Sequence, residues 1–173
     1  MPPDLLLVID TIYKPCGLVF TELKPEEESA EYDAFTFKIN NQSIKYRAAK
    51  ITPTKTGQFV TIWKRNGKGP IEPFHISDDW DLVIISTRND NKLGQFIFPK
   101  HTLYNKGIVS GNEKEGKRGV RVYPPWDKAV NKQAEKTQKW QLDYFIDFTN
   151  KNDIDNAKLQ QLLFITNTSL LQH

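Results

Sequence analysis

Six consecutive residues, Asp81-Leu-Val-Ile-Ile-Ser86, decide the fold that this sequence predicts. A strand that buries one face alternates apolar and polar residues, whereas a strand covered on both faces is apolar throughout. We therefore expect this segment to be a central strand with structure packed on both sides. Another strand is expected over residues 95–98, followed by a short helix over residues 101–106.

More strands are expected upstream of this segment. Residues 35–39 and 44–48 alternate apolar and polar positions, and Asn40-Asn41 forms the turn between them. A third strand is predicted over residues 58–65, which end at the loop Asn66-Gly-Lys-Gly-Pro70. Residues 18–24 are expected to be extended, and residues 120–123 are expected to form the last strand before Pro124-Pro125.

Helices are expected at both ends of the chain. Apolar residues at helical spacing predict a helix over residues 3–13, and a proline followed by three glutamates predicts a short one over residues 25–32. A long helix is expected over residues 128–147 with Asp127 as its N-cap, and a final helix over residues 154–165. Residues 166–173 are expected to be a frayed tail. The prediction is one α/β (α+β) domain over residues 1–173, in which helices flank a mixed central sheet.

Composition narrows the class of protein. The chain has 173 residues and a formal net charge of +3. Cys16 is the only cysteine, so an intramolecular disulfide is impossible. No stretch approaches the roughly 20 apolar residues of a membrane span, and the N-terminus lacks the basic leader of an export signal. We expect a cytoplasmic protein.

Charge is distributed unevenly along the chain. No acidic residue occurs between Ala34 and Ile71, whereas that stretch holds eight basic residues: Lys38, Lys45, Arg47, Lys50, Lys55, Lys64, Arg65 and Lys68. Most of them fall on predicted strands, where they would form a rigid surface of one sign. Such a surface attracts polyanions. The pattern predicts binding of nucleic acid.

Three groups of residues are candidates for this interface. The loop over residues 51–58 combines hydroxyls, an ammonium and an amide around a glycine, which suits phosphate recognition. Arginine and aromatic residues near residue 121 could stack on unpaired bases. Four lysines at steps of four, four and three would share one face of the long helix. The predicted interface is Arg47, Lys50, Thr52, Thr54, Lys55, Gln58, Lys64, Arg65, Arg121, Tyr123, Trp126, Lys128, Lys132, Lys136 and Lys139.

Catalytic patterns are weaker. The three histidines, His75, His101 and His173, share no spacing that suits a metal site. Three carboxylates precede the central strand and could hold Mg²⁺ for phosphodiester cleavage, or could be turn and strand-end residues: Asp78, Asp79 and Asp81. No cofactor is expected unless these carboxylates bind Mg²⁺.

The segment Ile51-Thr-Pro-Thr-Lys-Thr-Gly-Gln-Phe-Val-Thr-Ile-Trp-Lys-Arg65 resembles the MepB family. The resemblance continues through residues 94–98, 117–126 and 136–145, and covers about residues 30–147. MepB proteins are small bacterial proteins whose gene cluster also encodes a multidrug efflux pump and its regulator. The resemblance leaves open a role as an efflux accessory that binds an anionic small molecule or an acidic partner, and it implies no established enzymatic activity.

The predicted order of elements is also similar to the core of restriction-endonuclease-like proteins, which implies a nucleic-acid cleft beside the sheet. Those nucleases carry an acidic residue on the second core strand and Glu-x-Lys or Asp-x-Lys on the third. The matching stretches here, residues 46–50 and 58–64, contain no acid. We therefore expect the chain to bind nucleic acid without cleaving it. DNA is the expected ligand, single-stranded or distorted, because no helix-turn-helix is present. A metal-dependent nuclease and an efflux accessory are the alternatives.

Overall fold

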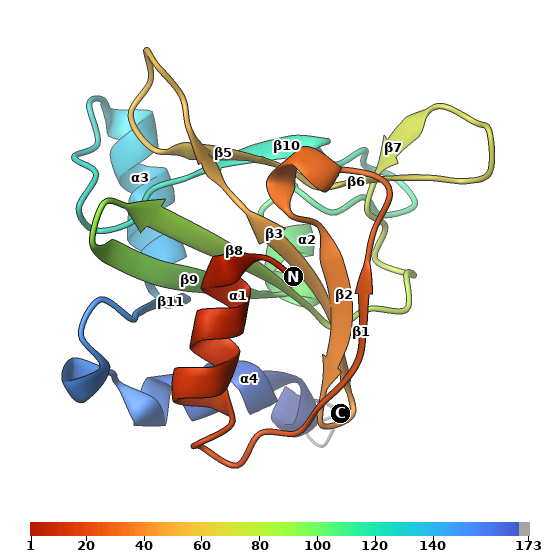
Figure 1. Ribbon diagram of the computed structural model, residues 1–173. Helices are drawn as coiled ribbons and strands as arrows, with labels where there is room; N and C mark the ends of the chain where they lie inside the picture. The colour runs from red at the N-terminus through yellow and green to blue at the C-terminus, as the bar shows by residue number, and fades with distance from the viewer. Residues whose placement is uncertain (170–173) are drawn as a thin grey trace.

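A six-stranded mixed sheet forms the middle layer of the protein in the computed structural model, which describes residues 1–169 (Figure 1). Neighbouring strands are antiparallel except β3 and β8, which are parallel. In spatial order the strands are β1 (Phe20–Pro25), β2 (Phe35–Ile39), β3 (Gln42–Ala48), β8 (Leu82–Asn89), β9 (Lys92–Pro99) and β11 (Phe145–Asp147). The predicted mixed sheet in an α+β domain is confirmed.

Strand β8 is buried on both faces, as its apolar sequence predicts. Leu82 and Ile84 belong to a hydrophobic cluster on one side of the sheet, and Val83 and Ile85 belong to a separate cluster on the other side. Consecutive side chains of a strand point to opposite faces, so an uninterrupted apolar run serves both clusters. The protein therefore has three layers with this sheet in the middle.

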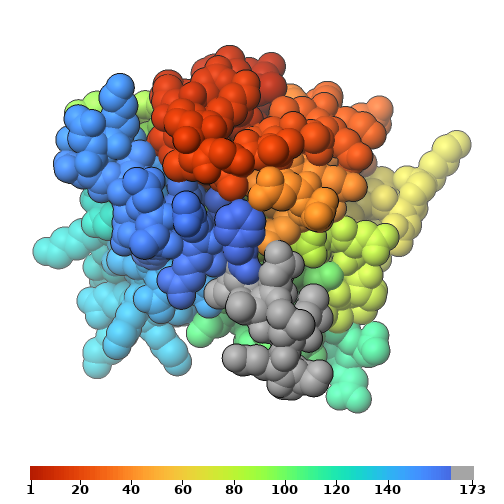
Figure 2. All heavy atoms as spheres, turned by 90° about the horizontal axis from the view of Figure 1, so that it is seen from below, coloured from red at the N-terminus to blue at the C-terminus, as the bar shows by residue number. Residues whose placement is uncertain are grey.

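Helices cover the first face. Helix α1 (Pro3–Val8) continues into the π-helix η1 (Ile9–Tyr13), so the predicted N-terminal helix is confirmed. Helix α4 (Asn156–Ser169) follows the short 3₁₀ helix η3 (Lys151–Asp153), and it begins and ends later than predicted. Figure 2 shows the red N-terminal residues beside the blue C-terminal ones on this face. Residues 170–173 of the predicted frayed tail lie outside the described residues.

The second face carries the smaller elements. A three-stranded sheet in the order β10-β5-β4 packs here with helices α2 and α3 (Figure 1). A two-stranded hairpin of β6 and β7 extends from it. The bounds are β4 (Lys50–Ile51), β5 (Gln58–Thr61), β6 (Trp63–Arg65), β7 (Ile71–Pro73), α2 (Lys100–Asn105), β10 (Gly119–Val122) and α3 (Lys132–Leu142).

The predicted strand over residues 58–65 is wrong as a single element of the central sheet. It divides at Ile62, whose backbone N–H donates to the Arg118 carbonyl at 2.9 Å. The part before the division pairs with β4 and β10, and the part after it pairs with β7. The comparison with the third core strand of restriction-endonuclease-like proteins therefore does not hold for residues 58–64.

Two predicted helices are shorter than expected. Only residues Ala30–Tyr32 form a 3₁₀ helix, η2, because Ser29 and Asp33 on either side adopt left-handed conformations with φ of 61° and 51°. Helix α3 begins at Lys132, and its N-cap is Asn131 rather than Asp127, with Asn131 Oδ1 accepting from Ala134 N at 2.8 Å.

The end of the predicted long helix is instead a strand. Residues Phe145–Asp147 form β11, where Phe145 pairs with Phe96 of β9. Strand β10 is therefore not the last strand. In the described residues, no helix has the length and apolar character needed to cross a bilayer.

Candidate functional site

A groove of about 400 Å³ lies between β10 and α3. We call it the β10–α3 groove. Strand β10 forms one wall and α3 forms the other. Its lining residues are Lys55, Phe59, Lys106, Ile108, Lys117, Gly119, Val120, Arg121, Tyr123, Asn131, Gln133, Ala134, Thr137, Trp140 and Gln141. They come from four separate parts of the chain, residues 55–59, 106–108, 117–123 and 131–141, so only the folded protein has this site.

The charge of this groove has one sign. Its charged lining residues are Lys55, Lys106, Lys117 and Arg121, and no carboxylate among the described residues lines it. None of the four forms an ion pair with any carboxylate of residues 1–169. Neighbouring unpaired cations in a concave surface focus a positive potential. An anionic ligand is the expected occupant.

Two of the cations are held in place by neutral groups. Arg121 Nη1 donates to the carbonyls of Thr56 at 3.3 Å and Gly57 at 3.2 Å. Lys106 Nζ lies 5.2 Å from the centre of the Trp140 ring. Carbonyl and π contacts orient a cation without cancelling its charge. These two side chains are therefore oriented in the groove while their positive charges stay available to an anionic ligand.

Two glutamines of α3 fix the distance between the walls. Gln141, which is only 1% exposed, accepts from Tyr123 N at 2.9 Å and donates to the Arg121 carbonyl at 3.0 Å. Gln138 Nε2 donates to the carbonyls of Tyr123, Pro124 and Asp127. The amide of Gln141 thereby joins α3 to β10. Satisfied buried amides of this kind make the groove rigid.

The loop over residues 51–58 forms one rim of the groove, but only part of it faces the groove. Lys55 lines the groove, and Thr54 is exposed. Gln58 is wrong as a ligand contact, because it is 1% exposed and its Nε2 donates to the Arg88 carbonyl at 3.2 Å. The Thr52 hydroxyl is also buried and has no hydrogen-bond partner in the described part of the chain. Gly57 has φ of 83° and packs against the Tyr123 ring, so no side chain fits there.

The basic residues of the central strands are neutralised by acidic residues. Arg47 is 1% exposed and forms an ion pair with Glu26, which also accepts from Lys45 Nζ at 2.5 Å. Burial lowers the pKa of Arg47, and the carboxylate of Glu26 opposes that shift. Arg47 is therefore wrong as a nucleic-acid contact: strand alternation placed it on the predicted basic surface, but it lies inside the protein.

Two further predicted contacts are paired in the same way. Lys64 Nζ donates to Asp78 Oδ1 at 2.5 Å, and Arg65 Nε donates to Glu28 Oε1 at 3.0 Å. Lys50 is exposed, and its ammonium lies 4.9 Å from the centre of the Tyr32 ring, outside the groove lining. The predicted basic face of the central sheet is thus not a free cationic surface.

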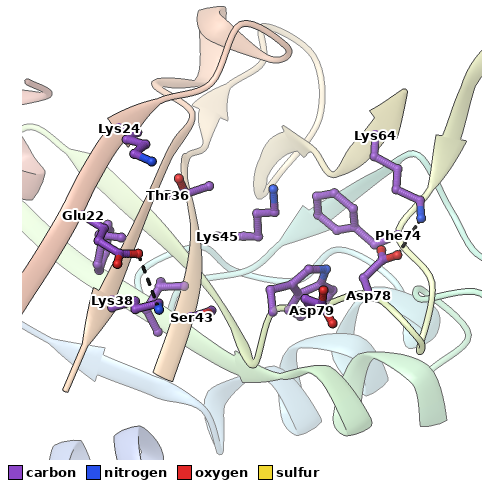
Figure 3. A pocket seen from close by; sticks show the side chains of 13 residues that line it. Glu22, Lys24, Thr36, Lys38, Ser43, Lys45, Lys64, Phe74, Asp78 and Asp79 are labelled. Atoms are coloured by element: carbon purple, nitrogen blue, oxygen red, sulfur yellow. Dashed lines mark hydrogen bonds and ion pairs between the residues drawn. The ribbon is translucent and has the colours of Figure 1, made fainter. Parts of the chain in front are cut away.

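The three aspartates before β8 lie away from the groove, in and beside a pocket of about 340 Å³ that Figure 3 shows. Asp78 and Asp79 line that pocket, where Asp78 also accepts from His75 N at 2.8 Å. Asp81 Oδ2 accepts from Ser43 N at 2.8 Å. Burial would raise the pKa of Asp78, but the hydrogen bonds from His75 N and Lys64 hold it below its ordinary value. These contacts are those of turn and strand-end carboxylates, and within residues 1–169 no cluster of three His, Cys, Asp or Glu could hold a metal ion.

The lysines of α3 do not face the groove. With about 3.6 residues per turn, Lys132, Lys136 and Lys139 share one side of the helix. Gln133, Thr137 and Trp140 line the groove from a different side. The prediction that four lysines share one face of this helix is also wrong, because Lys128 precedes α3 and is not part of the helix.

Trp126 packs against the core rather than standing beside Tyr123. Its ring is in edge-to-face contact with Phe145, with centroids 5.7 Å apart. The other side of Trp126 lines a second hollow together with Lys128. Of the predicted interface residues, the structure brings together Lys55, Arg121 and Tyr123 in the groove and places Trp126 and Lys128 next to it.

Comparison with known proteins places the chain in a family. The sequence model of the MepB-like family matches residues 26–147. The chain belongs to the MepB-like family. A solved structure of MepB is 33% identical, with a TM-score of 0.76, and the alignment covers 87% of this chain and 99% of that one. A solved structure of the bacterial homing endonuclease I-Ssp6803I is 12% identical, with a TM-score of 0.44, and the alignment covers 80% of this chain and 86% of that one. This similarity is too weak to support a conclusion about fold or function. Comparison with curated proteins gave no match.

All residues that line the β10–α3 groove lie within the MepB-like segment, whereas α1 and α4 lie outside it. Sequence reasoning missed Lys106, Lys117 and Trp140 as members of this site. A signal for two of them was present, because Lys117 and Trp140 occur in the segments that resemble MepB. Nothing in the sequence pattern indicated Lys106, which enters the groove from the end of α2.

Proposed function

We propose that this MepB-like protein binds nucleic acid, DNA in the first instance, by holding phosphates in the β10–α3 groove. The observation that carries the proposal is the set of four unpaired cations, Lys55, Lys106, Lys117 and Arg121, in a groove whose described lining holds no carboxylate. Phosphate contacts supply most of the affinity in nonspecific nucleic-acid binding. A cytoplasmic location is part of the proposal.

Neutral groups in the groove suit the same ligand. The side chains of Gln133 and Thr137 can donate hydrogen bonds to phosphate oxygens, which fixes register along a backbone. The rings of Tyr123 and Trp140 are half-buried in the walls and present π surface to a base or sugar. We propose binding without cleavage, because the groove lining offers no carboxylate to position a metal ion beside a phosphate.

Salt dependence of binding tests the proposal. The assay is fluorescence anisotropy of labelled DNA oligonucleotides at several salt concentrations. Four phosphate contacts predict a slope of log K against log salt of about −3 for single-stranded DNA and about −3.6 for duplex DNA. The charge reversals Lys55→Glu and Lys117→Glu should each weaken binding and make the slope less negative by about one unit or more.

The matched controls are Lys136→Glu and Lys139→Glu, which change the net charge equally but lie on the side of α3 away from the groove. They should leave most of the affinity and the slope intact. Equal losses from groove and control variants would show that the effect is one of net charge, and the proposed site would be wrong. Binding of inorganic phosphate, measured by calorimetry, without binding of any oligonucleotide would instead assign the groove to a small anion.

A further inference from the structure

A second hollow adjoins the β10–α3 groove and has a different character. Its volume is about 620 Å³, and Lys55 lines both spaces. The segment Lys55-Thr56-Gly57 separates them. The other lining residues of this second hollow are Ile51, Asn89, Trp126, Asp127, Lys128, Ala129 and Val130. A ligand held by Lys55 in the groove can therefore continue across this rim.

The second hollow exposes apolar surface. Val130 is 73% exposed and Ile51 is 58% exposed, and both line it together with Trp126. These are among the most exposed large apolar side chains in the described residues. Exposed apolar side chains grouped at a concave surface commonly mark a binding site. The occupant should have flat apolar surface, because the adjoining groove already supplies the cations.

Asp127 is the only carboxylate among the described lining residues of the second hollow, which Lys55 and Lys128 also line. Burial raises the pKa of its carboxyl group, and Lys92 opposes that shift. A carboxylate repels a phosphate but accepts hydrogen bonds from the exocyclic amines of bases. The amide of Asn89 adds both a donor and an acceptor. The groove, which four cations and no carboxylate line, is therefore the stronger site for phosphates, and the apolar and hydrogen-bonding surface of the second hollow suits bases.

We infer that the ligand is a single strand whose backbone lies in the β10–α3 groove and whose unstacked bases enter the second hollow beyond Lys55. This inference rests on the proposed function and deepens it. A duplex cannot make the same contacts, because its bases are paired and stacked inside. A mononucleotide supplies only one phosphate and one base, so it makes fewer of these contacts than a longer strand.

The experiment compares single-stranded and duplex DNA of the same sequence, and single strands of increasing length. We expect single-stranded DNA to bind at least tenfold more tightly than the duplex. Affinity should rise sharply once the strand reaches both spaces, in a series from two to about 12 nucleotides. The double variant Ile51→Ser/Val130→Ser should weaken binding of the long strand at least about tenfold, and about a hundredfold if bases cover both side chains, because burial of each such side chain is worth roughly a factor of ten.

Two measurements distinguish a loss of base contacts in the double variant from a loss of charge or a loss of folded protein. The double variant should keep the salt slope of the unmodified protein, since it removes no cation, and it should leave the shortest oligonucleotides unaffected. The matched control is Leu6→Ser/Leu7→Ser, which changes two exposed apolar residues of α1 on the other face of the sheet. The control should not affect binding.

Equal affinity for duplex and single strand would overturn the inference while leaving the proposed function standing. So would a double variant that binds long strands normally. Failure to bind any nucleic acid would overturn both. Lys117 lines the groove and not the second hollow, so Lys117→Glu should weaken binding of strands of every length, whereas the double variant should weaken binding of long strands only.

Discussion

The buried ion pair between Arg47 and Glu26 yields a sharp test of how this fold uses its charges. Arg47 is 1% exposed and Glu26 is 19% exposed, so the pair is largely removed from water. Removing one partner of a buried pair leaves the other charge uncompensated. We predict that Glu26→Ala lowers the free energy of unfolding by about 3 kcal/mol, at the lower end of such effects because Glu26 keeps some exposure.

For a domain of this size, a loss of about 3 kcal/mol corresponds to a fall in Tm of roughly 6–12 °C. Arg47→Met should behave differently. It replaces the guanidinium by an apolar side chain of similar length and removes the Nε group that has no hydrogen-bond partner among the described residues. Glu26 is not left uncompensated, because it still accepts from Lys45 Nζ at 2.5 Å and is 19% exposed, so the cost should be less than about 1 kcal/mol. The assay is urea and thermal denaturation followed by circular dichroism.

The control for this prediction is Glu22→Ala. Glu22 pairs with Lys38 at 3.5 Å, and both side chains are about half exposed, so the loss should be below about 1 kcal/mol. A fall in stability for Glu26→Ala no larger than that of Glu22→Ala would refute the reasoning. Arg47→Met should also keep full affinity for DNA; a strong loss of binding in a folded Arg47→Met protein would return Arg47 to the interface.

Two further predictions concern packing and pH. Gly94→Ala places a Cβ 2.1 Å from Phe145 Cζ, so it should lower the free energy of unfolding by about 1–3 kcal/mol, as measured by denaturation curves. Adding Phe145→Leu to the same chain should restore part of this loss. An unchanged stability in Gly94→Ala would contradict the close contact. The pKa of Asp78 is lower in the folded protein than in the unfolded chain, so its ionised carboxylate stabilises the folded state. This contribution is fully present above the pKa of the unfolded chain, about 3.9, and is lost as the pH falls through the pKa of the folded protein. Asp78→Asn should therefore be destabilising at pH 7 and nearly neutral at the lowest pH at which the protein stays folded, and an equal cost at every pH would exclude this linkage.

The layered fold could be predicted because its main signal is local. The segment Asp81–Ser86 is apolar at adjacent positions, and this requires cover on both faces whatever the rest of the chain does. The same kind of signal predicted the N-terminal helix over residues 3–13, which the structure confirms. The division at Ile62 could not be predicted, because its cause is a hydrogen bond to Arg118, which is 56 residues away in the chain.

The candidate site was harder to predict for a related reason. Alternation along a strand shows which residues share a face, but not which of the two faces becomes buried. It grouped Arg47 with the exposed cations, whereas the fold turns that side chain inward towards Glu26. Lys55 and Arg121 were candidates because each has local signals, a hydroxyl-rich loop around a glycine for Lys55 and neighbouring aromatic residues for Arg121. Lys106 has no such local signal, because its neighbourhood in the groove is formed by residues far from it in the chain.

The pairing of charges explains why one part of the surface stays cationic. The stretch from Ala34 to Ile71 has eight basic residues and no acid, but the preceding segment supplies Glu22, Glu26 and Glu28 as partners to Lys38, Arg47 and Arg65. Acidic residues near the start of the chain thereby neutralise Lys38 near the edge of the central sheet, Arg47 within that sheet, and Arg65 of the β6–β7 hairpin. They do not reach the β10–α3 groove on its second face, where the cations stay unpaired. Charge reversals at the sheet edge should consequently alter stability, and charge reversals in the groove should alter binding. If both sets of charge reversals changed stability and binding to the same extent, this division between structural and ligand-binding charges would be wrong.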